Sequence, residues 1–171
     1  MAKFNIPKLS AANRQRAQEA AHLTAIKRSK PGRPMTWLHK EGHLRGRMLD
    51  YGCGHGTDAD HFGLEKYDPG ESHFFPLPAG KFDTIVSQYV INVIGPEEGL
   101  VVLQKIQRLL KPGGRAFIVV RRDLDKPGFR SCQGEFTYQW NPRAFMQEVL
   151  GVEHPFHTGP GYDVFLLTNT R

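Results

Sequence analysis

The 171-residue sequence predicts an α/β fold with a mainly parallel, doubly wound sheet. Short apolar segments of β type alternate along the chain with segments of helical periodicity, which is the pattern of strand–helix–strand units. A glycine-rich loop, GCGHG at residues 52–56, directly follows one of the β segments. Glycine has no side chain to pack, so Gly52, Gly54 and Gly56 indicate positive φ angles or the close approach of another group to the backbone.

The first third of the chain predicts two helices. Residues 10–29 are rich in Ala, Gln, Arg and Lys, and Ser10 is a suitable N-cap for a helix there. The sequence KPGRP at residues 30–34 ends this helix, because two prolines and a glycine cannot continue it. Residues 35–44 then predict a short amphipathic helix that places Trp37 and Leu38 inward.

The middle of the chain predicts three strands and two helices. Met48–Tyr51 suits a short buried strand, and TDADHF after the glycine loop suits one or two helical turns with Thr57 or Asp58 as N-cap. A second strand is expected within residues 64–70 and a third from residue 82 to about 87. The clearest helix is expected over 96–110, where leucine and isoleucine recur at helical spacing before the sequence KPGG closes it.

The last third predicts a strand at 115–123 and a capped helix at 141–151. The helix lies between two further β segments, 136–140 and 163–168. We expect these two segments to pair with each other as an antiparallel edge at the carboxyl-terminal end of the sheet.

Composition places the chain among soluble globular proteins, with 39% hydrophobic and 23% charged residues. No stretch approaches the roughly 18 apolar residues of a membrane span. The first 20 residues lack the apolar region of a secretory signal. Cys53 and Cys132 provide neither a disulfide framework nor a metal motif. We therefore expect a cytoplasmic protein without membrane contact and without a bound metal.

Positive charge is concentrated at the amino terminus. Residues 1–47 contain 11 of the 23 lysines and arginines but only two of the 17 acids, although the net charge of the chain is only +6. We expect a basic, helical amino-terminal arm over residues 1–34 and one domain over residues 35–171. Such an arm suits a polyanionic partner, above all a nucleic acid. A solubilising, partly disordered arm explains the charge equally well.

Strand, glycine loop, helix start and a strand ending in an acid form the order of a nucleotide site. In open α/β sheets, ligands bind beyond the carboxyl ends of the strands. Asp68, at the end of the second predicted strand, can accept hydrogen bonds from two ribose hydroxyls. Asp50, directly before the loop, would repel a pyrophosphate and suits a ligand with a positive end. The spacing Gly-x-Gly-x-Gly also differs from the dinucleotide pattern Gly-x-Gly-x-x-Gly.

Two blocks of sequence resemble the class I S-adenosylmethionine-dependent methyltransferases. LDYGCGHG resembles the first motif of that family, and the segment from FDTIV to LLKPGGRAFIVV resembles its later block. The resemblance covers residues 46–122. It implies a compact, Rossmann-like version of the family's fold over residues 35–171, with S-adenosylmethionine as cofactor. The chain departs from the family in length, because it has room for neither a full second helix nor a long third strand between residues 68 and 82.

The resemblance also implies which residues touch the cofactor. Asp50 matches the position that holds the methionine amino group, and Asp68 matches the acid that binds ribose. The family's adenine-binding acid has no counterpart here, so Phe74, Phe75 and Leu77 are candidates for an apolar adenine wall or for cover at the sheet edge. The complete expected cofactor set is Asp50, Tyr51, Gly52, Cys53, Gly54, His55, Gly56, Asp68 and Gln88.

The methyl acceptor stays open at this point. The sequence SQYV stands where DNA adenine methyltransferases have Asp/Asn-Pro-Pro-aromatic, and neither cysteine follows a proline as in cytosine C5 enzymes. Tyr89 and Asn92 match positions that line the family's reaction centre. Arg121 and Asp123, which end the strand at 115–123, are candidates for holding or orienting an acceptor. Three hypotheses remain: a nucleic-acid methyltransferase, modestly favoured by the arm; a small-molecule or protein methyltransferase; and a non-catalytic cofactor-binding regulatory subunit.

Overall fold

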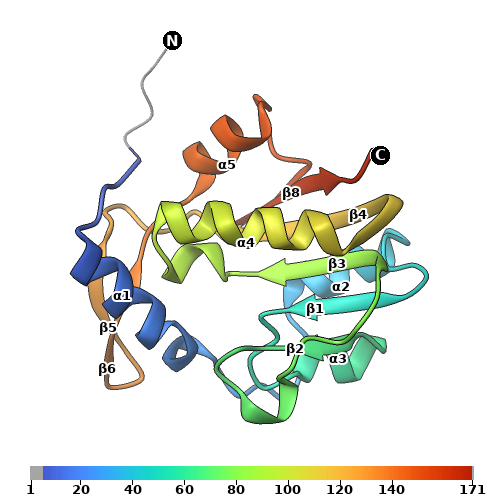
Figure 1. The fold of residues 1–171 in the computed structure, drawn as a ribbon, viewed down its shortest axis with the longest axis horizontal. Coiled ribbons are helices and arrows are strands. Elements are labelled where there is room, and N and C mark those ends of the chain that lie inside the picture. Colours follow the sequence, from blue (N-terminus) through green and yellow to red (C-terminus); the bar gives the residue numbers. More distant parts are fainter. Residues whose placement is uncertain (1–5, 171) are drawn as a thin grey trace.

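A six-stranded sheet forms the centre of the computed structural model, which describes residues 6–170. Its strand order is β2-β1-β3-β4-β8-β7 (Figure 1). The strands β1, β2, β3 and β4 are parallel to one another, and β8 is antiparallel to both β4 and β7. The predicted parallel sheet with an antiparallel carboxyl-terminal edge is therefore confirmed. The bounds are β1 (Met48–Tyr51), β2 (Glu65–Tyr67), β3 (Phe82–Gln88), β4 (Leu110–Arg121), β7 (His157–Gly159) and β8 (Tyr162–Thr168).

Helices pack on both faces of the sheet. On one face, Leu103 of α4 and Met146 of α5 share a core with Ile85 and Ile118 of the sheet. On the other face, α2 and α3 pack against the opposite sides of the same strands through residues such as Met35. The bounds are α1 (Ala11–Ala20), α2 (Arg33–Lys40), α3 (Thr57–Phe62), α4 (Pro96–Leu109) and α5 (Arg143–Leu150), with 3₁₀ turns η1 (Ala21–Thr24), η2 (Ser72–Phe74) and η3 (Ile91–Val93).

The strand order locates the place where a ligand binds in such a sheet. The chain runs from β1 outward to β2 and then crosses back to β3, on the other side of β1. In open α/β sheets, ligands bind at the carboxyl ends of the strands where the order reverses in this way. Between β2 and β3 the chain forms only the short turn η2, so the fold is as compact as the sequence predicts.

The amino-terminal segment packs on this end of the sheet rather than extending away from it. Figure 1 shows α1 and the following chain beside the ends to which the arrows of β1 and β3 point. Ser10 caps α1 by accepting a hydrogen bond of 3.3 Å from the Asn13 amide. Ala17 of α1 is fully buried in the same core as α4 and the sheet. The helix expected over residues 10–29 ends earlier, because η1 and an extended Ala25 follow α1.

One predicted strand pairing is wrong. The segment expected to pair with residues 163–168 is β6 (Glu135–Gln139), and it pairs instead with β5 (Gly128–Cys132) in a separate two-stranded sheet. Gln133 and Gly134 join the two strands with φ angles of +51° and +86°, as a two-residue hairpin turn of the primed type requires. β8 is mostly buried and lies between β4 and β7, so both of its edges are already occupied.

Candidate functional site

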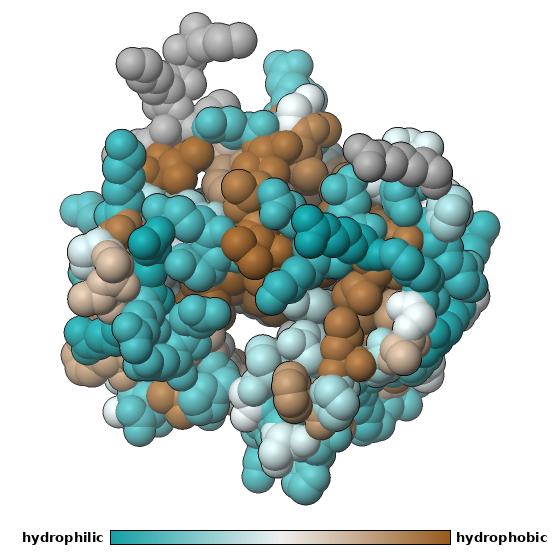
Figure 2. Space-filling model, in the orientation of Figure 1, coloured by the Kyte–Doolittle hydropathy of each residue, from teal (hydrophilic) through white to brown (hydrophobic). Residues whose placement is uncertain are grey.

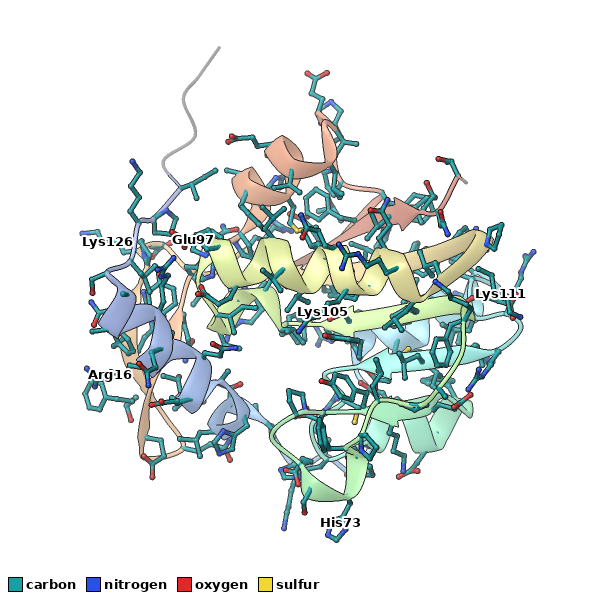
Figure 3. All side chains as sticks on the ribbon, viewed as in Figure 1. Arg16, His73, Glu97, Lys105, Lys111 and Lys126 are labelled. Carbon is teal, nitrogen blue, oxygen red and sulfur yellow. The ribbon has the colours of Figure 1, made fainter. Side chains whose placement is uncertain are left out.

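A cavity of about 980 Å³ lies at the carboxyl ends of β1, β2 and β3. This volume is within the range of sites that bind small ligands. Figure 2 shows the surface hollowed between the amino-terminal helices and the edge of the sheet that ends in β2. Four parts of the chain line the cavity: the glycine loop with the chain after β2, the segment from α1 to Arg28, the chain at the end of β3 from residue 88 to 94, and one side of α4 between Glu97 and Lys105. Figure 3 shows Glu97 at the end of α4 nearest α1, and Lys105 farther along that helix.

Backbone conformation and closely packed neighbours both require glycine in this loop. Gly52, Gly54 and Gly56 have φ angles of +82°, +54° and +78°, a region that other L residues rarely adopt. A Cβ at Gly52 would also collide with Val90, and one at Gly54 would lie 3.2 Å from the Cβ of Ala25. The loop therefore allows both the chain after β3 and the amino-terminal segment to approach the site closely.

Asp68 fixes the shape of this loop from the end of β2. Its Oδ2 accepts a hydrogen bond of 2.7 Å from the Gly54 amide, and its Oδ1 accepts one of 2.8 Å from the Gly70 amide. A carboxylate has about four lone-pair sites, so Asp68 keeps capacity for hydroxyl donors from a ligand. The residue predicted to bind ribose is thus in the cavity wall and already oriented by the backbone.

Asp50 lies at the bottom of the cavity and is 2% exposed. Burial is the main cause that raises the pKa of this carboxyl to about 8, and the negative charge of the neighbouring Asp58 acts in the same direction. Among the described residues, none gives Oδ1 of Asp50 a hydrogen bond. A buried acceptor without a partner is unfavourable, and a positively charged donor of a ligand is the group that best satisfies it.

Asp58 and Arg28 are central to the site, and the sequence did not point to either as a site residue. Asp58 is 2% exposed, and its carboxylate receives hydrogen bonds from Arg28, Gly32 and Gln88. The sequence suggested Asp58 only as a helix cap, whereas the residue at the N-cap position is Gly56. Its only local signal is its position two residues after the glycine loop, since its side-chain partners Arg28 and Gln88 are each 30 residues away.

Tyr89 is the one predicted catalytic residue that lines the cavity. Its φ angle of +62° is unusual for an aromatic residue, and such strained positions concentrate at functional sites. Burial raises the pKa of the Tyr89 hydroxyl to about 12, so this group is neutral at physiological pH. It can donate or accept a hydrogen bond there, but it does not act as an anionic base.

Asn92, Arg121 and Asp123 lie outside the cavity lining. The buried Asn92 accepts a 2.9 Å hydrogen bond from the Arg121 amide and donates to the carbonyl oxygens of Arg121 and Trp140 at 3.1 and 2.9 Å. The Arg121 guanidinium forms a bidentate pair with Asp123 at 2.9 and 3.0 Å. The contacts of Asn92 thus join the ends of β4 and β6 to the chain after β3.

The remaining expected cofactor residues also line the cavity. Tyr51 is one of them, and Tyr67, which the sequence did not suggest, lies beside it with ring centroids 4.9 Å apart, so that the two rings supply an aromatic surface. The apolar wall expected from residues 74, 75 and 77 is absent from the lining, and Phe75 is 60% exposed. Cys53 and His55 also line the cavity. Burial raises the pKa of the Cys53 thiol, so it stays protonated.

Residues 6–170 contain no group of three or more His, Cys, Asp or Glu side chains arranged to hold a metal ion. In the same range, no helix combines the length and the apolar character needed to cross a membrane.

Comparison with solved structures identifies the fold. A 1,6-didemethyltoxoflavin-N1-methyltransferase from Burkholderia thailandensis, solved with 1,6-didemethyltoxoflavin and S-adenosylhomocysteine, has a TM-score of 0.61 and 19% identity, covering 98% of this chain and 94% of that one. DhpI in complex with SAH has a TM-score of 0.64 and 14% identity, covering 95% and 100%. The SAM-bound amino pentose methyltransferase CalS10 from Micromonospora echinaspora has a TM-score of 0.53 and 14% identity, covering 97% and 99%.

Sequence comparison identifies the family. No curated protein matches the chain. The family model described as "Methyltransferase domain" matches residues 11–143. This range includes α1 and both sequence blocks that resemble the class I methyltransferases. The match covers more than half of the chain and crosses the boundary expected near residue 34. The chain therefore belongs to the methyltransferase domain family and has the class I methyltransferase fold.

Proposed function

We propose that this protein transfers a methyl group from S-adenosylmethionine to a small-molecule acceptor. The observation that carries the proposal is the pair of acids, Asp50 and Asp68, at the two sides of one glycine loop inside a single cavity of about 980 Å³. One acid has a buried oxygen without a partner, and the other is oriented by two backbone amides.

The residues present fit the cofactor. The unpartnered Oδ1 of Asp50 suits the ammonium group of the methionine part, and Asp68 suits the two ribose hydroxyls. Tyr51, Tyr67 and Val102 line the same cavity and offer a surface for the adenine ring. S-adenosylmethionine supplies a methyl group that its sulfonium already activates.

The contribution of the protein is therefore positioning and exclusion of water. The amino-terminal segment covers the carboxyl ends of the strands, with Ala25 close to Gly54 and with Arg28 bound to Asp58. Holding two reactants in an aligned geometry lowers a barrier by about 7 to 11 kcal/mol in the best cases. Tyr89, at the end of β3, has a neutral hydroxyl that can orient an acceptor by hydrogen bonding.

The arm's contacts favour a small acceptor over a nucleic acid. Arg28 is bound to the buried Asp58, Arg14 lies 3.6 Å from Glu97, and the Arg16 guanidinium lies 4.4 Å from the centroid of the Phe129 ring. These three arginines of the predicted basic arm are thus engaged inside the domain instead of forming a free polyanion-binding stripe. Neighbouring structures named for 1,6-didemethyltoxoflavin and for an amino pentose support the same choice.

The experiment is a methyl-transfer screen with radiolabelled S-adenosylmethionine. A fraction of low-molecular-mass metabolites should accept label, and DNA and RNA fractions should not. Calorimetry with S-adenosylhomocysteine runs in parallel. Binding without label transfer to any fraction would favour a non-catalytic cofactor-binding subunit, and label in nucleic acid would overturn the small-acceptor proposal. Binding of NAD without binding of S-adenosylhomocysteine would reject the cofactor.

A further inference from the structure

One buried carboxylate joins three segments that are far apart in the sequence. The Oδ2 of Asp58 accepts hydrogen bonds of 2.7 Å from Arg28 Nη2 and 2.8 Å from Gln88 Nε2, and its Oδ1 accepts one of 2.7 Å from the Gly32 amide. Asp58 belongs to α3, Gln88 ends β3, and the other two partners precede α2. A carboxylate buried to this degree is stable because three donors surround it.

Asp58 determines how the Gln88 side-chain amide is oriented. An ionised carboxylate only accepts hydrogen bonds, so the amide nitrogen of Gln88 must point toward it and the amide oxygen must point away. That oxygen, Oε1, is buried and has no hydrogen-bond partner among the described residues. Gln88 lines the cavity, so a ligand donor that reaches this oxygen would satisfy it.

The same carboxylate places Arg28 at the cavity. Arg28 lines it, and a guanidinium has five N–H donors, of which Asp58 receives one. The neighbouring chain fits closely, since a Cβ at Gly32 would lie only 2.6 Å from Nη1 of Arg28. Arg28 therefore retains donors for an anionic group while its position is fixed.

Gln88 and Asp50 point to the same face of the sheet. Asp50 is the register partner of Val86 in the neighbouring strand, and Gln88 follows Val86 by two residues. Side chains two residues apart in a strand lie on one face, and register partners share that face. The two unpartnered oxygens, Asp50 Oδ1 and Gln88 Oε1, therefore flank the same part of the cavity, which Arg28 also lines.

We propose that Asp58 is a positioning residue for the amino-acid end of S-adenosylmethionine. It turns the Gln88 oxygen toward the cofactor's ammonium group, which Asp50 also receives, and it holds Arg28 where the guanidinium meets the cofactor's carboxylate. Two acceptor oxygens and one cationic donor match the charges of a zwitterionic amino acid. The inference rests on the proposed function, because it assigns contacts to that cofactor.

The test compares two ligands that differ only at the amino-acid end. S-adenosylhomocysteine carries the ammonium and carboxylate groups, whereas 5′-methylthioadenosine has the adenosine and thioether parts without them. Asp58→Asn places an amide N–H₂ group beside the three donors of Arg28, Gly32 and Gln88. It therefore no longer holds the Gln88 amide in one orientation. We expect calorimetry to show affinity for S-adenosylhomocysteine lowered about tenfold or more, as loss of charged hydrogen bonds predicts, and affinity for 5′-methylthioadenosine lowered less than about twofold.

Two further variants keep the test decisive. Asp60→Asn removes an exposed acid from the same helix and should leave both affinities unchanged. Gln88→Met removes the amide at similar volume and should also lower affinity for S-adenosylhomocysteine more than affinity for 5′-methylthioadenosine. This variant keeps the proposal testable if Asp58→Asn does not fold. Equal losses for both ligands would make Asp58 a structural latch, and unchanged affinities would give it no role, so either result overturns the proposal. Wild-type protein that binds neither ligand would instead reject the proposed function.

Discussion

The amide of Gly54 donates a hydrogen bond of 2.7 Å to Oδ2 of Asp68, so the protein itself joins the glycine loop to the second acid of the site. The Gly70 amide holds the other oxygen of the same carboxylate. A carboxylate that backbone amides hold in one orientation loses less conformational entropy when a ligand binds to it. The acid therefore serves both the loop and the ligand.

Asp68→Ala should lower affinity for S-adenosylhomocysteine by about tenfold or more, because it removes the hydroxyl acceptors and frees the Gly54 amide. Calorimetry measures the affinity, and circular dichroism checks that the fold is retained. Asp125→Ala, which removes an exposed acid, serves as the control. An unchanged affinity in Asp68→Ala would remove this residue from the cofactor site.

Asp50 should make cofactor binding depend on pH. Its pKa of about 8 means that the carboxyl is largely protonated at pH 7 in the free protein, whereas an ammonium ligand favours the ionised form. Binding at pH 7 should therefore release about one proton, and affinity should rise between pH 6 and about 8. Calorimetry in buffers of different ionisation enthalpy counts the proton, and Asp50→Asn should abolish its release.

The same carboxyl should affect the stability of the free protein in the opposite direction. Its pKa is raised from 3.8 to about 8 in the folded state, so the folded state binds the proton more tightly than the unfolded state does. Stability from this group is complete below pH 3.8 and is lost as the pH rises toward 8. Thermal unfolding of Asp50→Asn should show a weaker decline over that range than the wild type. Parallel declines in the two proteins would contradict the pKa.

Asn92 should matter for stability more than for ligand binding. Its buried side chain makes three hydrogen bonds, one with the amide of Arg121 and two with carbonyl oxygens. Asn92→Leu should lower the free energy of unfolding by about 2 to 3 kcal/mol, because it leaves these backbone groups without partners. Urea unfolding measures this loss, while affinity for S-adenosylhomocysteine in the folded protein should change little. If Asn92→Leu instead lowered the affinity tenfold and left the free energy of unfolding unchanged, Asn92 would be a ligand-binding residue.

Local signals explain what the sequence could predict. β1 and α4 were expected within one or two residues of their bounds, because a β segment before a glycine loop and regular leucine spacing are visible in a short window. Local signals of the same kind predicted Asp50 and Asp68 as cofactor-binding residues, and both line the cavity. The family match and the neighbouring folds confirm the resemblance that these segments carried.

Long-range contacts explain what the sequence could not predict. Alanines and leucine continue the helical pattern past Ala20, but contacts to Gly54, Asp58 and Gln133 keep the chain extended from Ala25 onward. The cluster around Asp58 brings together groups 26 and 30 residues apart, and no spacing pattern encodes such a distance. β5 escaped notice because a glutamine, not a glycine or asparagine, begins its tight turn at positive φ.

Residues 27, 28 and 30 separate the two roles that the basic arm can have. Lys27, Arg28 and Lys30 are all exposed, but of these three only Arg28 also lines the cavity and binds Asp58. Arg28→Gln should therefore weaken binding of S-adenosylhomocysteine by about tenfold, since it removes a charged partner of a buried carboxylate. The double variant Lys27→Gln/Lys30→Gln should leave that affinity within about twofold, because exposed charges contribute little.

The double variant also tests the acceptor class. A nucleic-acid acceptor would be held partly by such lysines, and each lost phosphate contact would reduce the dependence of binding on salt. Under the small-molecule proposal, the acceptor's KM should be the same for the double variant and the wild type from low to high salt. Steady-state kinetics with the acceptor from the labelling screen makes this measurement. A raised KM together with a flatter salt dependence would assign the exposed lysines to a polyanionic acceptor, whatever the result for Arg28→Gln.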